Sequence, residues 1–457
     1  MSIVTFSDNN LSYHKISYLL KNDGEKMSQG KYSTWQKYLA LTLISIAVGV
    51  IYKVPYLREV FYEPLKQGLG ITNTEIGFIS TVFGTTSTLL FIVGGLVADK
   101  FNAKKILTWS MLAMGALTFW YSTVPSYNQI LIIMVGMGCA TTLGFWSAFL
   151  KALNILGGEN EQGRMYGISE GVRAVAGMLV AFAALYCIEL ATTATEGLKY
   201  TLIFYGIVYV LIGLGIWAFL PDVSEEKSEE DNEKFSINYL LIAIKMPSVW
   251  LVTILIFALY SIYALQSYTT PYMQNVLGIS TATVGLVGII RQYGIGLMAS
   301  PIGGIFADKI GSAAKVVGIS CAVVALCVIG FLVLPTSMAP IIFIVLIITV
   351  AFLIYAGRGT QWATMKEAGI PTKYVGTATG IISFFGYTPD LYIYAQVGTW
   401  LDEYPVEQAY NMIWWYMIGM SILAVAASLG ILFYVKKRSN ESKKELVKQS
   451  EAQGEMQ

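Results

Sequence analysis

The sequence has little charge and almost no histidine. Asp, Glu, Lys and Arg make up 13% of its 457 residues, whereas soluble domains average about 25%, so an ordinary soluble enzyme is excluded. The one histidine, His14, lies in a polar N-terminal stretch. Neither a histidine-ligated metal nor a histidine proton relay can therefore lie in the apolar part of the chain, and any proton carrier there must be a carboxylate.

Cysteine is also scarce, and no phosphate-binding loop occurs. The absence of a GxxxxGK(S/T) motif argues against ATP hydrolysis. Thirty basic against twenty-nine acidic residues give a net charge of +1, so no basic field attracts nucleic acid. The four cysteines lie in apolar runs without metal-ligand spacing, which is typical of small core side chains: Cys139, Cys187, Cys321 and Cys327. We expect no cofactor, no metal site and no nucleic-acid partner.

Long apolar stretches dominate what is present, since 55% of the residues are hydrophobic. Six stretches long enough to span a bilayer as helices precede the polar segment Asp222–Lys234, and six follow it. They lie at residues 37–57, 75–98, 104–123, 128–151, 166–189, 199–220, 248–271, 281–307, 313–334, 340–362, 375–400 and 410–435. The pattern predicts an all-α membrane protein with six-helix bundles at 37–220 and 248–436, an acidic linker at 221–247, and tails at 1–36 and 437–457.

Basic residues in the short loops predict the orientation. They fall on one side of the twelve spans, which the positive-inside rule assigns to the cytoplasm: Lys100, Lys104, Lys105, Lys151, Arg164, Lys309, Lys315, Lys366, Lys373, Lys436, Lys437 and Arg438. The opposite side carries only three basic residues, Arg58, Lys66 and Lys199, and an acidic group that consists of Asp402, Glu403 and Glu407. We therefore expect a multi-pass protein of the plasma membrane, the inner membrane in a bacterium, with both termini, the linker and both tails in the cytoplasm.

The two halves repeat each other. A GGxxADK pattern ends the second and the eighth span, where Asp99 and Asp308 are 209 residues apart. The same offset relates Gly167 to Gly376 and Gly171 to Gly380. Matches at one offset indicate an internal duplication, and paired halves around a midplane cavity are typical of secondary transporters.

The segment from Gly95 to Lys105, GLVADKFNAKK, resembles the loop motif of the major facilitator superfamily, and Gly304 begins its second copy. This resemblance implies twelve helices, alternating access, and a cytoplasmic gate that includes Gly95, Asp99, Lys100, Gly304 and Asp308. The loop lysines are alternatively explained as topology signals alone. A second similarity, from Tyr56 to Phe61, is to the organophosphate and organic-anion porter branch.

Several polar residues lie at membrane depth, where an ionisable side chain costs at least ~2.5 kcal/mol. Lys53 is ~24 Å along the first span and Arg291 ~15 Å along the eighth. We interpret Lys53, Arg291 and Asp390 as residues that bind the solute, although snorkelling of Lys53 and a structural pair between Arg291 and Asp390 are the alternatives. Four polar neighbours complete the expected binding set: Tyr263, Gln266, Gln292 and Tyr293. Arg58 is expected at the outer interface.

Three further ionisable residues suggest coupling or gating. Glu170 and Arg173 are three apart on the fifth span and therefore share a helical face. They are either a self-neutralising pair or a titratable carboxylate coupled to the cavity. Arg358, between two glycines on the tenth span, is the expected partner of Glu170 in an inner gate.

These observations favour a secondary active transporter of a small polar, anionic organic solute. An excess of deep positive charge attracts an anion, and the expected partners are that solute, protons or a counter-solute, and the lipid bilayer. A proton-coupled exporter of amphipathic drugs is the main alternative. A membrane sensor that does not transport is a further one. No enzymatic activity is expected.

Overall fold

The computed structural model describes residues 34–157, 162–221 and 237–454, and within its helices the side chains of 91–100 and 442–454 and of a few residues at helix ends are not described. The acidic segment Asp222–Lys234 and most of the expected N-terminal tail lie outside the described residues. The described chain forms helices and no strand, as the all-α prediction requires.

Six spans form the first half. The first and second spans, α2 and α4, are connected by the 3-10 turn η1 and the short helix α3. The fourth span is divided into α6 and α7. Their bounds are α2 (Thr34–Ile51), η1 (Leu57–Glu59), α3 (Tyr62–Leu69), α4 (Asn73–Lys100), α5 (Ala103–Ser122), α6 (Tyr127–Thr142), α7 (Phe145–Gly157), α8 (Gln162–Glu189) and α9 (Ala194–Phe219).

Six spans also form the second half, which completes the predicted set of twelve. Three of these spans are interrupted. Their bounds are α11 (Pro247–Leu265), η3 (Gln266–Tyr268) and α12 (Thr269–Asn275); α13 (Thr281–Ile289), the π-helix η4 (Ile290–Gly294) and α14 (Ile295–Ile310); α15 (Ala313–Val333); α16 (Pro340–Thr360); α18 (Val375–Gly386), η6 (Thr388–Leu391) and α19 (Ile393–Glu403); and α20 (Val406–Gly454). Short helices α10 (Ile237–Ile244) and α17 (Ala363–Glu367) lie outside the spans.

The outer surface of both halves is apolar. By length and composition, eight of the described helices could cross a membrane. Large apolar side chains such as Leu211, Leu326 and Phe433 lie exposed on α9, α15 and α20. Contiguous apolar surface of this kind marks contact with a membrane, where helices satisfy their own backbone hydrogen bonds. Each half packs its own cluster of buried apolar side chains behind this surface.

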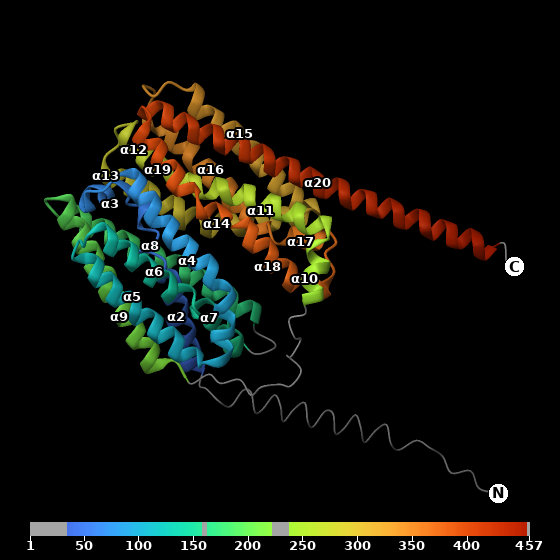
Figure 1. The fold of residues 1–457 in the computed structure, drawn as a ribbon, viewed down its shortest axis with the longest axis horizontal. Helices are drawn as coiled ribbons and strands as arrows, with labels where there is room; N and C mark the ends of the chain where they lie inside the picture. The colour runs from blue at the N-terminus through green and yellow to red at the C-terminus, as the bar shows by residue number, and fades with distance from the viewer. Residues whose placement is uncertain (1–33, 158–161, 222–236, 455–457) are drawn as a thin grey trace, which may run out of the picture.

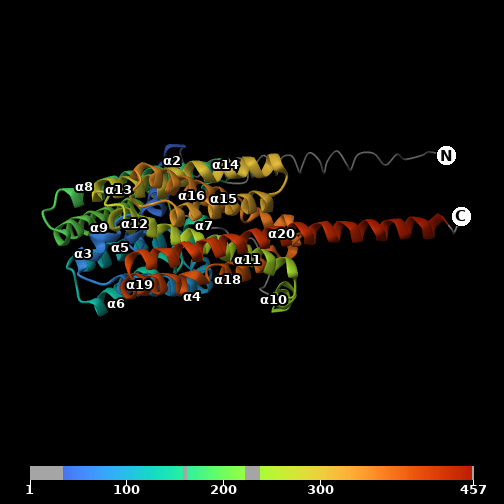
Figure 2. The same cartoon turned by 90° about the horizontal axis from the view of Figure 1, so that it is seen from above.

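The two halves lie side by side, and α20 continues well beyond them (Figures 1 and 2). We call the end that carries Lys104, Lys105 and Lys315 the basic end, and the end that carries Asp402, Glu403 and Glu407 the acidic end. Helices α3, α12 and α13 lie together at the acidic end, whereas α10, α17 and α18 lie toward the basic end (Figure 1).

The halves close against each other at the acidic end. A Cβ on Gly77 of α4 would collide with the Tyr394 carbonyl of α19, and one on Gly398 would collide with the Asn73 carbonyl. Glycine is therefore required for this close approach of α4 and α19. Asp402 accepts four hydrogen bonds from the N-terminus of α4, from Asn73 and Thr74, with heavy-atom distances of 2.6–3.2 Å.

The basic end is more open around the repeated glycines. A Cβ on Gly167 or Gly171 of α8, or on Gly376 or Gly380 of α18, would meet no atom within 4 Å. Unlike Gly77 and Gly398, these four glycines make no close contact with the other half. The fold is therefore captured with the acidic end closed.

Besides the fourth span, which is divided into α6 and α7, four spans are interrupted where unbroken helices were predicted. The first helix ends at Ile51 rather than at residue 57, four residues before Pro55, and the eleventh is interrupted at Pro389. Proline cannot donate the backbone hydrogen bond that continues a helix. The seventh span changes to a 3-10 turn at Gln266 and the eighth to a π-helix at Ile290, and π segments are frequent at functional sites.

Candidate functional site

The interruptions place polar side chains of both halves at one level inside the molecule. Arg58 and Glu59 come from the interrupted first span, Gln266 from the seventh, Arg291 from the eighth and Asp390 from the eleventh. All five are buried. We call these residues, together with Lys53, Gln292, Arg358 and the tyrosines described below, the central cluster.

Arg58 lies inside the protein rather than at the outer interface where the sequence suggested it. Its side chain is 2% exposed, because the chain turns inward after Ile51 and carries η1 into the contact between the halves. Its Nη1 donates to Ser267 Oγ at 3.1 Å, and its guanidinium carbon lies 3.7 Å from the ring centre of Tyr394. The Nε and Nη2 groups have no hydrogen-bond partner among the described residues.

Arg291 uses its guanidinium to join three interrupted spans. Its Nη2 donates to the Glu59 carbonyl at 2.6 Å, and its Nη1 donates to the Gln266 carbonyl at 2.7 Å and to Thr269 Oγ1. The Glu59 carbonyl also accepts from the Thr270 hydroxyl, and the Gln266 carbonyl also accepts from the Thr269 hydroxyl. Arg291, which is fully buried, adds a charged donor to each carbonyl. Only its Nε lacks a partner in the described structure, so a direct role in binding the solute stays a prediction.

A buried carboxylate, Glu59, lies beside this arginine. Its Oε2 accepts a 2.6 Å hydrogen bond from Gln292 Nε2, which also donates to the Tyr263 hydroxyl at 3.2 Å. The Tyr355 hydroxyl donates to Gln292 Oε1 at 3.1 Å. The predicted residues Tyr263 and Gln292 thus form one network with Glu59. Sequence reasoning omitted Glu59 from the site, although its place six residues after Lys53 in a charged stretch was a usable signal.

Asp390 lies on the other side of the cluster. Its Oδ2 accepts a 2.7 Å hydrogen bond from the Tyr260 hydroxyl, while Oδ1 has no partner among the described residues. Arg358 stacks on a tyrosine nearby, with its guanidinium carbon 3.7 Å from the ring centre of Tyr263 and 5.5 Å from that of Tyr260. Its Nη1 is buried and likewise unpartnered within the described structure.

Lys53 and Tyr293 meet across the halves. The Lys53 ammonium lies 3.3 Å from the ring centre of Tyr293, a cation–π contact that replaces part of the lost hydration. Lys53 is buried, so its side chain does not snorkel to the surface. The sequence placed both residues in the binding set, and the structure brings them together.

Of the residues predicted for gating or coupling, Arg358 lies in the central cluster, whereas the others whose side chains are described lie outside it. Glu170 and Arg173 form the expected intrahelical pair at 2.9 Å, with side chains 56% and 38% exposed. A Cβ on Gly304 would meet no atom within 4 Å, and Asp308 is exposed near the end of α14. The side chains of the other three predicted gate residues lie outside the described part of the chain: Gly95, Asp99 and Lys100.

The central cluster has more unused donors than acceptors. Buried N–H groups without a partner in the described structure are carried by Arg58, Gln266, Arg291 and Arg358, whereas the unused carbonyl and carboxylate acceptors are one oxygen each of Gln266 and Asp390. The Tyr394 hydroxyl, which can donate and accept, is also unpartnered there. Leaving a buried polar group unsatisfied costs about 1–3 kcal/mol, so such groups indicate a site that takes up a hydrogen-bonding molecule. The described residues contain no group of three His, Cys, Asp or Glu side chains that could hold a metal ion.

Comparisons with known proteins agree with this architecture. The chain is 31% identical over 420 residues to the inner membrane protein YqcE of Escherichia coli, which covers 90% of this chain and 98% of that one. It is 27% identical to the E. coli inner membrane protein YihN, with 91% and 99% covered. A probable nitrate/nitrite antiporter, NarK1 of Thermus thermophilus, is 21% identical, with 79% and 86% covered.

The fold also matches a solved structure. A bacterial homologue of the human lysosomal transporter Spinster, in an inward-facing and occupied conformation, superimposes with a TM-score of 0.68 at 14% identity, covering 89% of this chain and 98% of that one. The family model of the Major Facilitator Superfamily matches residues 38–389. Twelve spans in two repeated halves, the polar cluster between them and these matches together show that the chain belongs to the major facilitator superfamily of membrane transporters.

Proposed function

We propose that the protein is a secondary active transporter of a small, polar, anionic organic solute, bound in the central cluster next to Arg58 and Arg358. The observation that carries this proposal is the surplus of buried, unpartnered N–H groups on these arginines. A guanidinium matches a carboxylate or phosphate through parallel hydrogen bonds. An oxygen-rich anion would satisfy these donors, whereas a cation or an apolar drug would leave them unpaired.

The charges of the cluster support the same class of solute. Lys53, Arg58, Arg291 and Arg358 are four cations, and Glu59 and Asp390 are two carboxylates. The two positive charges in excess favour an anion. Glu63, further toward the acidic end, accepts a hydrogen bond from Asn275 and reduces this excess without reversing it. The name of the relative NarK1 specifies nitrate and nitrite, which are also anions.

The proposal includes coupling to protons or to a counter-solute. Glu59 and Asp390 are the carboxylates inside the cluster, whereas Glu170 is exposed and paired. Either buried carboxylate could take up a proton when the arginines release or bind an anion, because their charges interact across a poorly hydrated site. Glu59→Gln should therefore weaken the dependence of transport on a proton gradient, while Glu170→Gln, the matched control, should preserve it. Exchange of two anions would leave both variants independent of the gradient.

The first experiment is a thermal-shift screen of the purified protein. Sugar acids, dicarboxylates and sugar phosphates are compared with the corresponding neutral sugars, since a ligand at 100 times its Kd stabilises by about 2.7 kcal/mol. Any ligand found is then tested for uptake into proteoliposomes. Stabilisation by anions alone supports the proposal.

Variants assign the binding role. Arg58→Gln and Arg358→Gln should weaken anion binding by about 2–5 kcal/mol, which corresponds to roughly 30-fold or more. Arg58→Lys should retain part of the affinity, because lysine keeps the charge but not the planar fork. Selective stabilisation by amphipathic cations would instead indicate the drug exporter, and binding of an anion without flux would indicate the sensor.

A further inference from the structure

A cavity of about 580 Å³ lies on the outside of the first half, between α5 and α9 and toward the basic end. These two helices pack together on the side of the first half that faces away from the second (Figures 1 and 2). The central cluster and the contact between the halves are elsewhere, so this cavity has no place in the proposed transport site.

One part of the cavity is basic and polar. Lys104 and Lys105 lie in the first turn of α5, after the cap residue Asn102, and in the described structure neither ammonium group has a hydrogen-bond or ion-pair partner. The helix N-terminus adds partial positive charge there. Thr108, one turn further, lines the same cavity; it is 5% exposed, and its hydroxyl has no partner among the described residues.

The other part of the cavity is apolar and faces outward. Trp109 and Trp217 are 69% and 66% exposed, and Leu112 and Leu214 lie beside them. Tryptophan is enriched where a membrane protein meets the headgroup region. The cavity thus changes from cationic to apolar along one groove, which matches a molecule with an anionic head and an apolar chain.

We propose that this groove binds one anionic phospholipid. Its phosphate lies at the ammonium groups of Lys104 and Lys105, with Thr108 as an additional donor, and the beginning of an acyl chain lies along Leu214 and the two tryptophans. Basic pockets between membrane helices are suited to such head groups. A soluble anion would use the lysines but gain nothing from the exposed tryptophans.

The test is native mass spectrometry of the full-length protein in detergent, titrated with phosphatidylglycerol and with phosphatidylcholine of the same acyl chains. Each lysine near an anionic lipid contributes a factor of about five, so the double variant Lys104→Gln, Lys105→Gln should bind phosphatidylglycerol about 25-fold more weakly. Binding of phosphatidylcholine should stay unchanged. The matched control, Lys436→Gln with Lys437→Gln, removes the same charge from exposed positions of α20 and should bind like the wild type.

Two further measurements distinguish a phospholipid from a soluble anion as the ligand. Glycerol 1-phosphate, a head group without chains, should bind far more weakly than the lipid. Trp109→Ala should weaken the binding of the lipid and leave the binding of glycerol phosphate unchanged. Equal affinity for glycerol phosphate and for lipid would assign a soluble anion instead. Unchanged phosphatidylglycerol binding by the double lysine variant, or equal affinity for the two lipids, would overturn the proposal.

Discussion

The hydrogen bonds of Asp402 allow a specific prediction about conformational balance. Its carboxylate bridges the halves at the acidic end by accepting from the backbone and the side chains of Asn73 and Thr74. Hydrogen bonds to a charged group contribute about 1.5–3 kcal/mol each when buried. Asp402 is exposed, so solvent replaces most of this energy, and we assign about 2 kcal/mol to all four bonds together.

Asp402→Ala should therefore shift the ratio of closed to open acidic ends by roughly 30-fold, because 1.4 kcal/mol corresponds to a factor of ten. Spin labels on exposed Gln67 of α3 and Val406 of α20 would report the opening as a distance distribution, in a background without the four native cysteines. Glu403→Ala, which removes a neighbouring carboxylate, is the matched control. The same distance distribution in both variants and the wild type would refute the reasoning.

The pH dependence of this contact follows from the same bonds. Burial raises the pKa of the Asp402 carboxyl, but the hydrogen bonds from Thr74 and Asn73 outweigh it and hold the pKa below its ordinary value of 3.8. A depressed pKa means that the stabilisation is complete above the ordinary value and is lost only as the pH falls through the lowered one. Closure of the acidic end by Asp402 should thus be constant between pH 5 and 8. A label distance that changes over this range would contradict that assignment.

Three other predictions concern helix contact, folding and orientation. Gly77→Ala should prevent closure of the acidic end and abolish transport, whereas Gly171→Ala, which meets no atom in this conformation, should leave the label distances of the wild type; equal behaviour would contradict the close-approach argument. Arg291→Gln should lower the unfolding temperature even without solute, since the buried carbonyls of Glu59 and Gln266 each lose a charged hydrogen-bond donor; an unchanged temperature measured by fluorescence would contradict this. Cysteines at Lys104 and Glu403 should react from opposite sides of the membrane, the former from the cytoplasm; labelling of both from one side would overturn the orientation.

The twelve spans were predictable because their signal is local. Apolar length depends only on neighbouring residues, and the repeat is found by comparing two stretches of the sequence, so both were visible without coordinates. The interruptions were not, since a hydropathy average over about twenty residues does not register a change from α to π or 3-10 hydrogen bonding. The eighth span read as one helix, yet the π segment at Ile290–Gly294 changes the direction in which its side chains point.

The central cluster was predictable only in part. Lys53, Gln292 and Asp390 were found because a polar residue within an apolar span is conspicuous. Arg58 was assigned to the interface because its distance along an ideal helix placed it there, whereas the chain leaves the helix at Ile51. Its burial depends on Ser267 and Tyr394, in the other half of the chain, and no local pattern contains that information.

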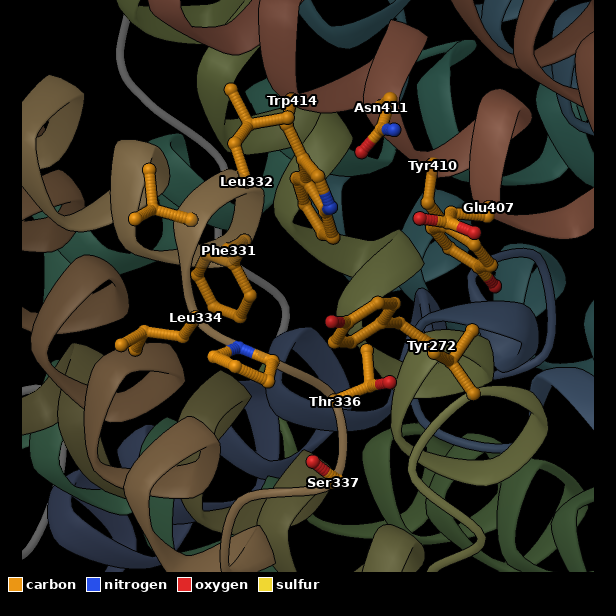
Figure 3. Close-up of a pocket in the computed structure, with 13 residues that line it drawn as sticks. Tyr272, Phe331, Leu332, Leu334, Thr336, Ser337, Glu407, Tyr410, Asn411 and Trp414 are labelled. Carbon is orange, nitrogen blue, oxygen red and sulfur yellow. The ribbon is translucent and has the colours of Figure 1, made fainter.

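A second cavity, of about 310 Å³, lies at the acidic end of the second half and has an aromatic wall (Figure 3). Tyr272 contacts Phe331, Tyr410 and Trp414 edge to face, with ring centres 5.0–5.7 Å apart. Such pairs add about 0.5–1.5 kcal/mol each beyond apolar burial. This packing joins α12, α15 and α20 at the acidic end of the second half.

The hydrogen bond from Arg58 to Ser267 shows how a protein with two repeated halves can place one charged side chain between them. The two residues are 209 positions apart, which is the offset of the internal repeat. Arg58 and Ser267 are therefore equivalent positions of the two halves, and a contact between equivalent positions lies on the axis that relates the halves. Two identical halves would set arginine against arginine there, and like charges in a poorly hydrated site repel strongly. A cation on the axis therefore requires unequal partners. A fused chain, whose halves mutate separately, can place a single arginine at its own centre of symmetry, which a dimer of two identical six-helix subunits cannot do.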